Sequence, residues 1–267
     1  MASGIGRLKA IGEAVLGGRS QDIQARVVGQ TAIDPDKHVV IERQRLVDRR
    51  FDGLRLDSFS AVQSQFERCS FRNIQIQDAT WGGGKKQSFY VNCSFDGAQF
   101  RSVAPGNAKF VECSFRDVHI SEFNAFDVEL QSCVFSGRID KGYLNAKRRA
   151  RLGIFGRKRN SIFGNDFRDC VLRDFAFRSG VELDRQELPT GDEYCYLADA
   201  ASALKRGRAI VQAWPEAETK RLALVLLDVI ARDLKSGQEQ QLVRIPEHGQ
   251  FAAPAKRLRE VLEAVGA

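Results

Sequence analysis

Apolar residues recur every five positions between residues 39 and 177, and this spacing leaves few folds open. It fits neither an α-helix, which repeats every 3.6 residues, nor a β-strand, which alternates every two. Three uninterrupted series carry the repeat, and every member except Pro105 is apolar. The members are Ile41, Leu46, Phe51, Leu56, Ala61, Phe66, Phe71, Ile76 and Trp81, then Tyr90, Phe95, Phe100, Pro105, Phe110, Phe115, Ile120, Ala125, Leu130 and Phe135, and finally Ile162, Phe167, Leu172 and Phe177.

A repeat this short indicates a solenoid, in which each coil covers its apolar interior with the neighbouring coils. A second inward position lies two residues before many of these centres, as Ile74 does before Ile76. Because a separation of two is the alternation of a strand, each unit is predicted to form a short extended side followed by a corner. Four such sides would close one square coil.

The cysteines test this interpretation independently. Two breaks interrupt the series, with nine residues from Trp81 to Tyr90 and 22 from Asp140 to Ile162, which correspond to insertions of 4 and 17 residues. Once these insertions are subtracted, five cysteines recur every 20 residues. Side chains stacked in parallel make a poor disulfide, so free, buried thiols in a reducing compartment are expected, with a metal column as the alternative. The predicted column contains Cys69, Cys93, Cys113, Cys133 and Cys170.

The tripeptides around these cysteines share one pattern: C-S-F at 69–71, 93–95 and 113–115, C-V-F at 133–135, and C-V-L at 170–172. They resemble the A-[D/N]-L-x-x motif of the pentapeptide-repeat family, with Cys for Ala and usually Phe for Leu. The resemblance covers roughly half the chain. It implies a mainly β fold, a right-handed quadrilateral parallel β-helix of nearly six coils over residues 39–185, with insertions near 82–86 and 141–160.

The two ends of the chain lack the repeat. Residues 3–17 are expected to form an amphipathic helix within an N-terminal segment, 1–38, that ends in a polar linker. This helix would cap the first coil, with membrane-surface or partner binding as the alternative. No secretory signal and no run of 18 apolar residues are found, which favours a cytoplasmic protein without a membrane span.

Residues 190–267 are expected to form a small, mainly α-helical domain. Its second helix has no wide polar face, so we expect that helix at the domain centre or in a homodimer interface. The expected elements are a helix capped by Asp192 and running to about Val211, a helix from Pro215 to Leu234, a strand from Gln241 to Ile245, and a helix from Pro254 to Val265.

Positive charge is concentrated in the long insertion, where residues 141–162 carry eight cations and no acid. Such density, with Tyr143 and Phe155 interleaved, suits phosphate neutralisation and base stacking; a solvated loop without a ligand is the alternative. The candidate partner-binding cations are Lys147, Arg148, Arg149, Arg151, Arg157, Lys158 and Arg159.

The expected register places both insertions beside one face. With the cysteine side counted as the first, the short insertion, with Lys85 and Lys86, should leave between the third and fourth sides. The long one should leave between the second and third, so that Phe126 and Phe163 stack on the third side between two cationic loops. The alternative is that the long loop or the C-terminal domain folds over these rings.

No catalytic, cofactor-binding or metal-binding motif is found: H-E-x-x-H, G-x-S-x-G and C-x-x-C are all missing from the sequence. The first hypothesis is therefore a non-catalytic scaffold or adaptor for a protein or nucleoprotein partner, with nucleic acid bound through residues 141–160. The second comes from the resemblance, because some pentapeptide-repeat proteins imitate duplex DNA and bind type II topoisomerases such as gyrase. Enzyme activity in the C-terminal domain is a distant third.

Overall fold

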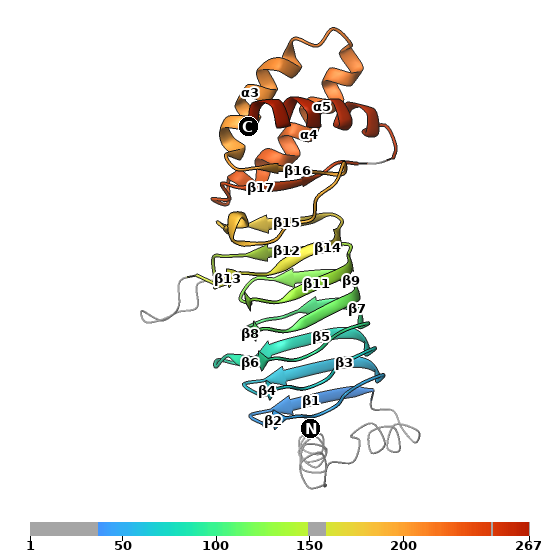
Figure 1. The fold of residues 1–267 in the computed structure, drawn as a ribbon, viewed down its shortest axis with the longest axis vertical. Coiled ribbons are helices and arrows are strands. Elements are labelled where there is room, and N and C mark those ends of the chain that lie inside the picture. The colour runs from blue at the N-terminus through green and yellow to red at the C-terminus, as the bar shows by residue number, and fades with distance from the viewer. Residues whose placement is uncertain (1–36, 149–158, 247, 267) are drawn as a thin grey trace, which may run out of the picture.

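The computed structural model describes residues 37–148, 159–246 and 248–266. Over these residues the chain forms a parallel β-solenoid of about five turns, followed by a small part with three helices (Figure 1). The solenoid inferred from the five-residue spacing is thus confirmed. The helix expected over residues 3–17 lies outside the described residues.

Every strand pair within the solenoid is parallel, and two sheets run along its length. The larger sheet contains, in order, β1 (His38–Glu42), β3 (Arg55–Val62), β5 (Gln75–Gly83), β7 (Gln99–Ala104), β9 (Ser114–Ala125), β11 (Val134–Ile139) and β14 (Asp166–Leu172), with β12 (Gly142–Asn145) pairing β9 and β15 (Phe175–Arg178). The second sheet contains β2 (Arg45–Val47), β4 (Gln65–Glu67), β6 (Ser88–Val91), β8 (Ala108–Val111), β10 (Glu129–Gln131) and β13 (Ile162–Phe163).

The interior is a set of stacked columns. On the first side, the side of Cys69, one phenylalanine from each coil lies on the next with ring centroids 4.6 to 4.8 Å apart and planes within 12° of parallel. This interval matches the distance between neighbouring strands, so the stacking follows directly from the strand pairing. The stacked rings are Phe51, Phe71, Phe95, Phe115, Phe135 and Phe167, all of them buried.

Many of the five-residue units end in a corner at which one residue adopts the left-handed backbone conformation. At the corner after the fourth side, the equivalent residue in each of five successive coils is not glycine and has φ between 51° and 54°. L-residues pay for this conformation, and polar side chains such as Asn and Asp tolerate it best. The residues are Asp48, Arg68, Asn92, Glu112 and Ser132.

One strand changes the register expected from the sequence. β12 pairs with both β9 and β15, and Leu144 lies between Ala125 and Phe177 as the centre of a complete third side. From the sequence, these residues were expected within the long insertion. In addition, the step from Phe135 to the next centre, Ile139, is one residue short, with a register shift at this point.

The cysteine column is corrected as a result. Cys170 pairs in register with Gly137 on the second side and does not follow Cys133. Asn165 takes the next place in the column: its Oδ1 accepts from the backbone N of Cys133 at 3.0 Å, and its Nδ2 donates to the carbonyl of Leu130 at 3.0 Å. The column therefore contains four thiols, Cys69, Cys93, Cys113 and Cys133.

All six cysteines of the chain are free and buried. In the column, the thiols of Cys69, Cys93 and Cys113 each donate to a carbonyl of the preceding coil, at 3.4 to 3.5 Å. Burial raises the pKa of Cys113 well above its ordinary value and raises that of Cys170 to about 12. Cys113 and Cys170 are thus held in their neutral form inside the core.

The C-terminal part closes the end of the solenoid. β16 (Tyr194–Leu197) and β17 (Gln241–Arg244) form an antiparallel pair between the last coil and the helices α3 (Ala200–Gln212), α4 (Ala217–Leu234) and α5 (Ala252–Gly266) (Figure 1). Gln238 Oε1 accepts from the backbone N of Gly180 and Val181, at 3.0 and 2.9 Å. Because an uncovered last coil would leave such amides unpaired, this part acts as a cap.

The expected C-terminal elements need two corrections. Asp192 does not begin a helix; α3 is capped by Asp199, which accepts from the backbone N of Ser202 at 3.0 Å, and the residues before it form β16. α4 is not enclosed at the centre of the domain, because Val225 and Val229 are 39% and 48% exposed; the alternative, a homodimer interface on this helix, stays a prediction. The expected strand is present as β17.

Replacing Phe115 with alanine should lower the free energy of unfolding by about 3–5 kcal/mol, because the cavity removes stacking on both faces of the ring. Phe115 lies between Phe95 and Phe135 at 4.6 and 4.7 Å. Denaturant unfolding of the variant measures the loss. Phe126→Ala, a half-buried ring outside the core, is the control and should cost about 1 kcal/mol or less. Equal losses in the two variants would contradict the assigned core.

The thiols should be protected until the protein unfolds. A thiol-reactive reagent at neutral pH should modify the native protein slowly, because the thiols are buried and the reagent cannot reach them. In denaturant all six cysteines should react. Rapid reaction of several thiols in the native protein would show that the columns are not packed as described.

Candidate nucleic-acid interface at one corner of the solenoid

Both insertions leave the solenoid at the same corner, between the third and fourth sides. The short one lies between β5 and β6, and the long one lies between β12 and β13. The long insertion was expected at the corner between the second and third sides; it leaves one corner later because β12 forms a complete side. Three coil steps separate the two insertions, roughly 14 Å along the axis. We call this the insertion corner; it holds residues 82–87, 106–107, 126–127 and the described ends of the long insertion, 146–148 and 159–161.

The long insertion begins and ends in a short antiparallel stem. Lys147 and Arg159 form a β-bridge, and the backbone N of Asn160 donates to the carbonyl of Ala146 at 2.6 Å. The side-chain amide of Asn160 donates to the carbonyls of Asn145 and Phe126, both at 2.7 Å. Asn160 is buried, so it fixes the stem to its own coil and to the preceding one.

Arg148 extends this support along the corner. Its guanidinium donates to Asn107 at 3.3 Å and lies 3.5 Å from Asp127, and both side chains of the Arg148–Asp127 pair are mostly covered, with 17% and 11% exposed. Asn107 in turn donates to the carbonyl of Lys85 at 3.2 Å. A continuous polar chain thus joins the two insertions, and Arg148 supports the loop rather than lying on its outer surface.

The short insertion is fixed at its base by Tyr90. The Tyr90 hydroxyl donates to the carbonyl of Trp81 at 2.9 Å, which bridges the residues on either side of the insertion. Burial raises the pKa of Tyr90 well above its ordinary value, so the phenol remains a donor. Lys85 and Lys86 are exposed beyond this bridge.

The other predicted cations divide into two groups. Lys147 and Arg159 are exposed at the stem. Arg149, Arg151, Arg157 and Lys158 lie outside the described residues.

The predicted apolar strip does not form. Phe126 lies in the insertion corner with its ring 4.6 Å from that of Tyr143, whereas Phe163 lies on the fourth side, opposite Gln131. The two rings were expected on one side because the register omitted β12. Phe163 instead lies under the guanidinium of Arg185, 4.7 Å from the ring centre.

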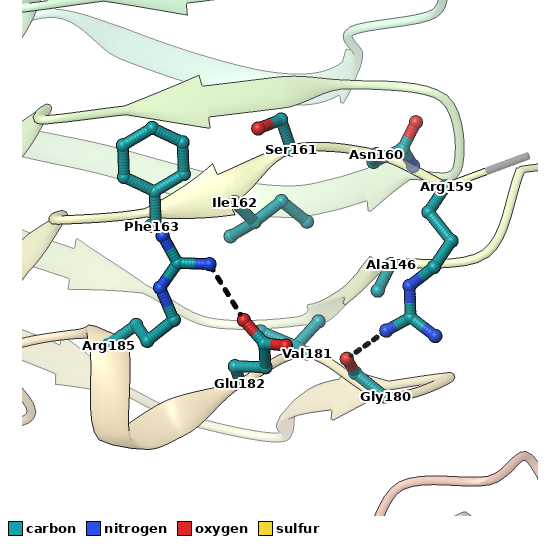
Figure 2. A pocket seen from close by; sticks show the side chains of 10 residues that line it. All are labelled: Ala146, Arg159, Asn160, Ser161, Ile162, Phe163, Gly180, Val181, Glu182 and Arg185. Carbon is teal, nitrogen blue, oxygen red and sulfur yellow. Dashed lines mark hydrogen bonds and ion pairs between the residues drawn. The ribbon is translucent and has the colours of Figure 1, made fainter. Parts of the chain in front are cut away.

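A polar cavity of about 170 Å³ opens beside the stem, on its C-terminal side. Figure 2 shows Arg159 and Arg185 at opposite ends of this cavity, with Glu182 pointing toward Arg185. Arg159 donates to the carbonyl of Gly180 at 2.5 Å, and Arg185 donates to Glu182 at 2.9 Å. Gly180, Glu182 and Arg185 follow the last regular coil and were not predicted as site residues. The sequence signal that could have identified them is their position, about one coil after Arg159.

One outward column of the first side alternates in the sign of its charged residues, with Asp52 mostly covered at 8% exposed. Successive coils place Asp52, Arg72, Asp96 and Arg116 in one column. Asp52 accepts from the backbone N of Arg72 at 2.8 Å, and Asp96 does the same for Arg116 at 2.9 Å. Along this column the negative charges are interrupted at every second coil.

No protein-family model matches the chain, and no curated protein matches it in sequence. Among the described residues, no group of three or more His, Cys, Asp or Glu side chains is placed to hold a metal ion. Of the helices in the same described ranges, none combines the length and the apolar character needed to cross a membrane.

Arg148→Ala should destabilise the protein by about 1–3 kcal/mol, because it removes hydrogen bonds and leaves the mostly covered Asp127 carboxylate without its guanidinium partner. Lys147→Ala removes the adjacent, exposed cation and should change stability by less than about 0.5 kcal/mol. Denaturant unfolding of both variants checks this. If both substitutions were equally mild, the polar chain would not support the corner.

Proposed function

We propose that this protein is a non-catalytic binding protein, a rigid β-solenoid that presents a basic loop and a helical C-terminal part to a macromolecular partner, and that this partner is nucleic acid. The observation that carries the proposal is the convergence of two cationic insertions on one corner. Lys85, Lys86, Lys147 and Arg159 are exposed there, at the two ends of the polar chain.

Arg148 has a structural role in the corner, but the remaining positive charge of the long insertion has none that a coil requires. A coil closes without it, and the mutual repulsion of eight cations among residues 141–162 costs free energy. Phosphate groups would offset this repulsion and release counterions on binding. The solenoid contributes a fixed support, because the stem is held by Asn160 and Arg148 rather than by a flexible linker.

Membership of the pentapeptide-repeat family is part of the proposal, and it rests on the tripeptides around the cysteines. The alternative taken from that family is a DNA mimic that binds a type II topoisomerase. Such mimicry depends on an acidic rod, and the alternation of Asp52, Arg72, Asp96 and Arg116 favours the basic corner instead. Buried free thiols suit a reducing compartment, so we propose a cytoplasmic location.

The salt dependence of oligonucleotide binding tests whether the basic loop binds nucleic acid. Wild-type protein should bind a labelled oligonucleotide, and log affinity should fall linearly with log salt, with a slope of about −0.7 to −0.9 for each phosphate neutralised. Replacing Arg149, Arg151, Arg157 and Lys158 together with serine should make that slope shallower by about 2 or more and weaken binding at least tenfold at low salt.

The matched control removes the same number of charges elsewhere. Arg55, Arg101, Arg173 and Lys205 are exposed on other surfaces, and their replacement with serine should leave the slope nearly unchanged. Equal effects of the two quadruple variants would show that binding depends on the net charge of the protein and not on the loop. Binding that does not respond to salt would refute the proposed function.

A further inference from the structure

We propose that the cavity beside the stem is a seat for one phosphodiester group of a nucleic acid, held between Arg159 and Arg185. This inference rests on the proposed function and deepens it, because it assigns a ligand group to one described residue at the C-terminal end of the long insertion, Arg159, and to one beyond it, Arg185. Figure 2 shows the two guanidinium groups at the ends of one cavity.

The two arginines come from neighbouring coils. Arg159 belongs to the returning strand of the stem, and Arg185 ends the short 3₁₀ helix Leu183–Arg185 on the next coil. Each guanidinium carries five N–H donors in a planar fork that suits phosphate oxygens. One donor of Arg159 is engaged by Gly180 and one of Arg185 by Glu182, so donors remain for an anion.

Both guanidinium groups are positioned before any ligand arrives. Arg185 is held over the ring of Phe163 and by Glu182. Arg159 lies against Gly180, whose φ is +83°; a Cβ at this position would come within 2.8 Å of Arg159 Nη2. The glycine therefore leaves the space in which the guanidinium lies, and an ordered donor pair loses little entropy on binding.

The floor of the cavity is equally well fixed. The backbone N of Gly180 and that of Val181 both donate to Gln238, a residue that is 1% exposed and whose side-chain amide also donates to the carbonyl of Val181 at 2.8 Å. The C-terminal cap thus supports the segment against which Arg159 lies.

Charge and size select the ligand. Two arginines and the carboxylate of Glu182 give the cavity a formal charge of +1, which one phosphodiester, with its single negative charge, would balance. The cavity of about 170 Å³ is well below the roughly 300–1,000 Å³ of pockets for drug-sized molecules. It therefore suits a single small group on a longer chain, reached beside the basic loop.

The test uses the full-length protein and a labelled oligonucleotide of mixed sequence at about 50 and 200 mM salt, with affinity followed by fluorescence anisotropy. Arg185→Gln should weaken binding about tenfold at the lower salt and make the log–log slope shallower by about 1, as expected for one lost phosphate contact. Arg173→Gln, which removes an exposed arginine from the second side, should behave as wild type.

A second variant should act in the opposite direction. Glu182→Gln frees Arg185 from its carboxylate partner and should tighten binding about threefold, whereas Asp174→Asn, which removes an exposed acid from another corner, should not. If Arg185→Gln matches Arg173→Gln while the wild-type slope stays steep, the cavity is not a phosphate seat and the loop alone binds. If the wild type shows no salt-dependent binding, the proposed function fails and this inference fails with it.

Discussion

The stacking of equivalent positions at one strand spacing is the interaction on which the rest of the structure depends. Each coil takes its register from the coil before it through parallel strand pairing and through rings stacked about 4.7 Å apart, such as Phe115 on Phe135. This regularity leaves little room inside, so extra residues can leave the solenoid only at corners. Two insertions at the same corner are consequently held in line along the axis, although 59 positions separate residues 86 and 145 in the sequence.

In the insertion corner, one cation fixes the position of the stem while other cations remain exposed. Arg148 pairs with Asp127 and donates a hydrogen bond to Asn107. These contacts, together with the buried amide of Asn160, fix the stem. The remaining described cations of the corner stay exposed. On the far side of the stem, Gly180 and Gln238 connect the polar cavity to the helical cap, so the C-terminal part contributes to the geometry of the candidate site as well as to the closure of the solenoid.

Periodicity predicted the solenoid and most of its interior because a buried centre in each side is a direct physical requirement. It failed at β12, where Gly142 and Leu144 form a side within a basic stretch that resembled an insertion. The short step at Gly137 made Asp140 look like a centre in place of Ile139, which kept the cysteine spacing at 20 and misplaced Cys170 and Phe163. The cap could not be predicted, because Gln238 contacts residues 57 and 58 positions away and no local pattern encodes such a contact.

Site-specific photocross-linking tests the central claim, that the insertion corner is the face that binds nucleic acid. A photoreactive residue would replace Lys85 or Lys147 in the corner, and Arg55 or Arg101 on the second side. If the corner binds nucleic acid, both corner positions should form cross-links to a labelled oligonucleotide that are lost at high salt, and the second side should form few. Equal cross-linking from the two surfaces, or cross-linking from the second side alone, would contradict this claim.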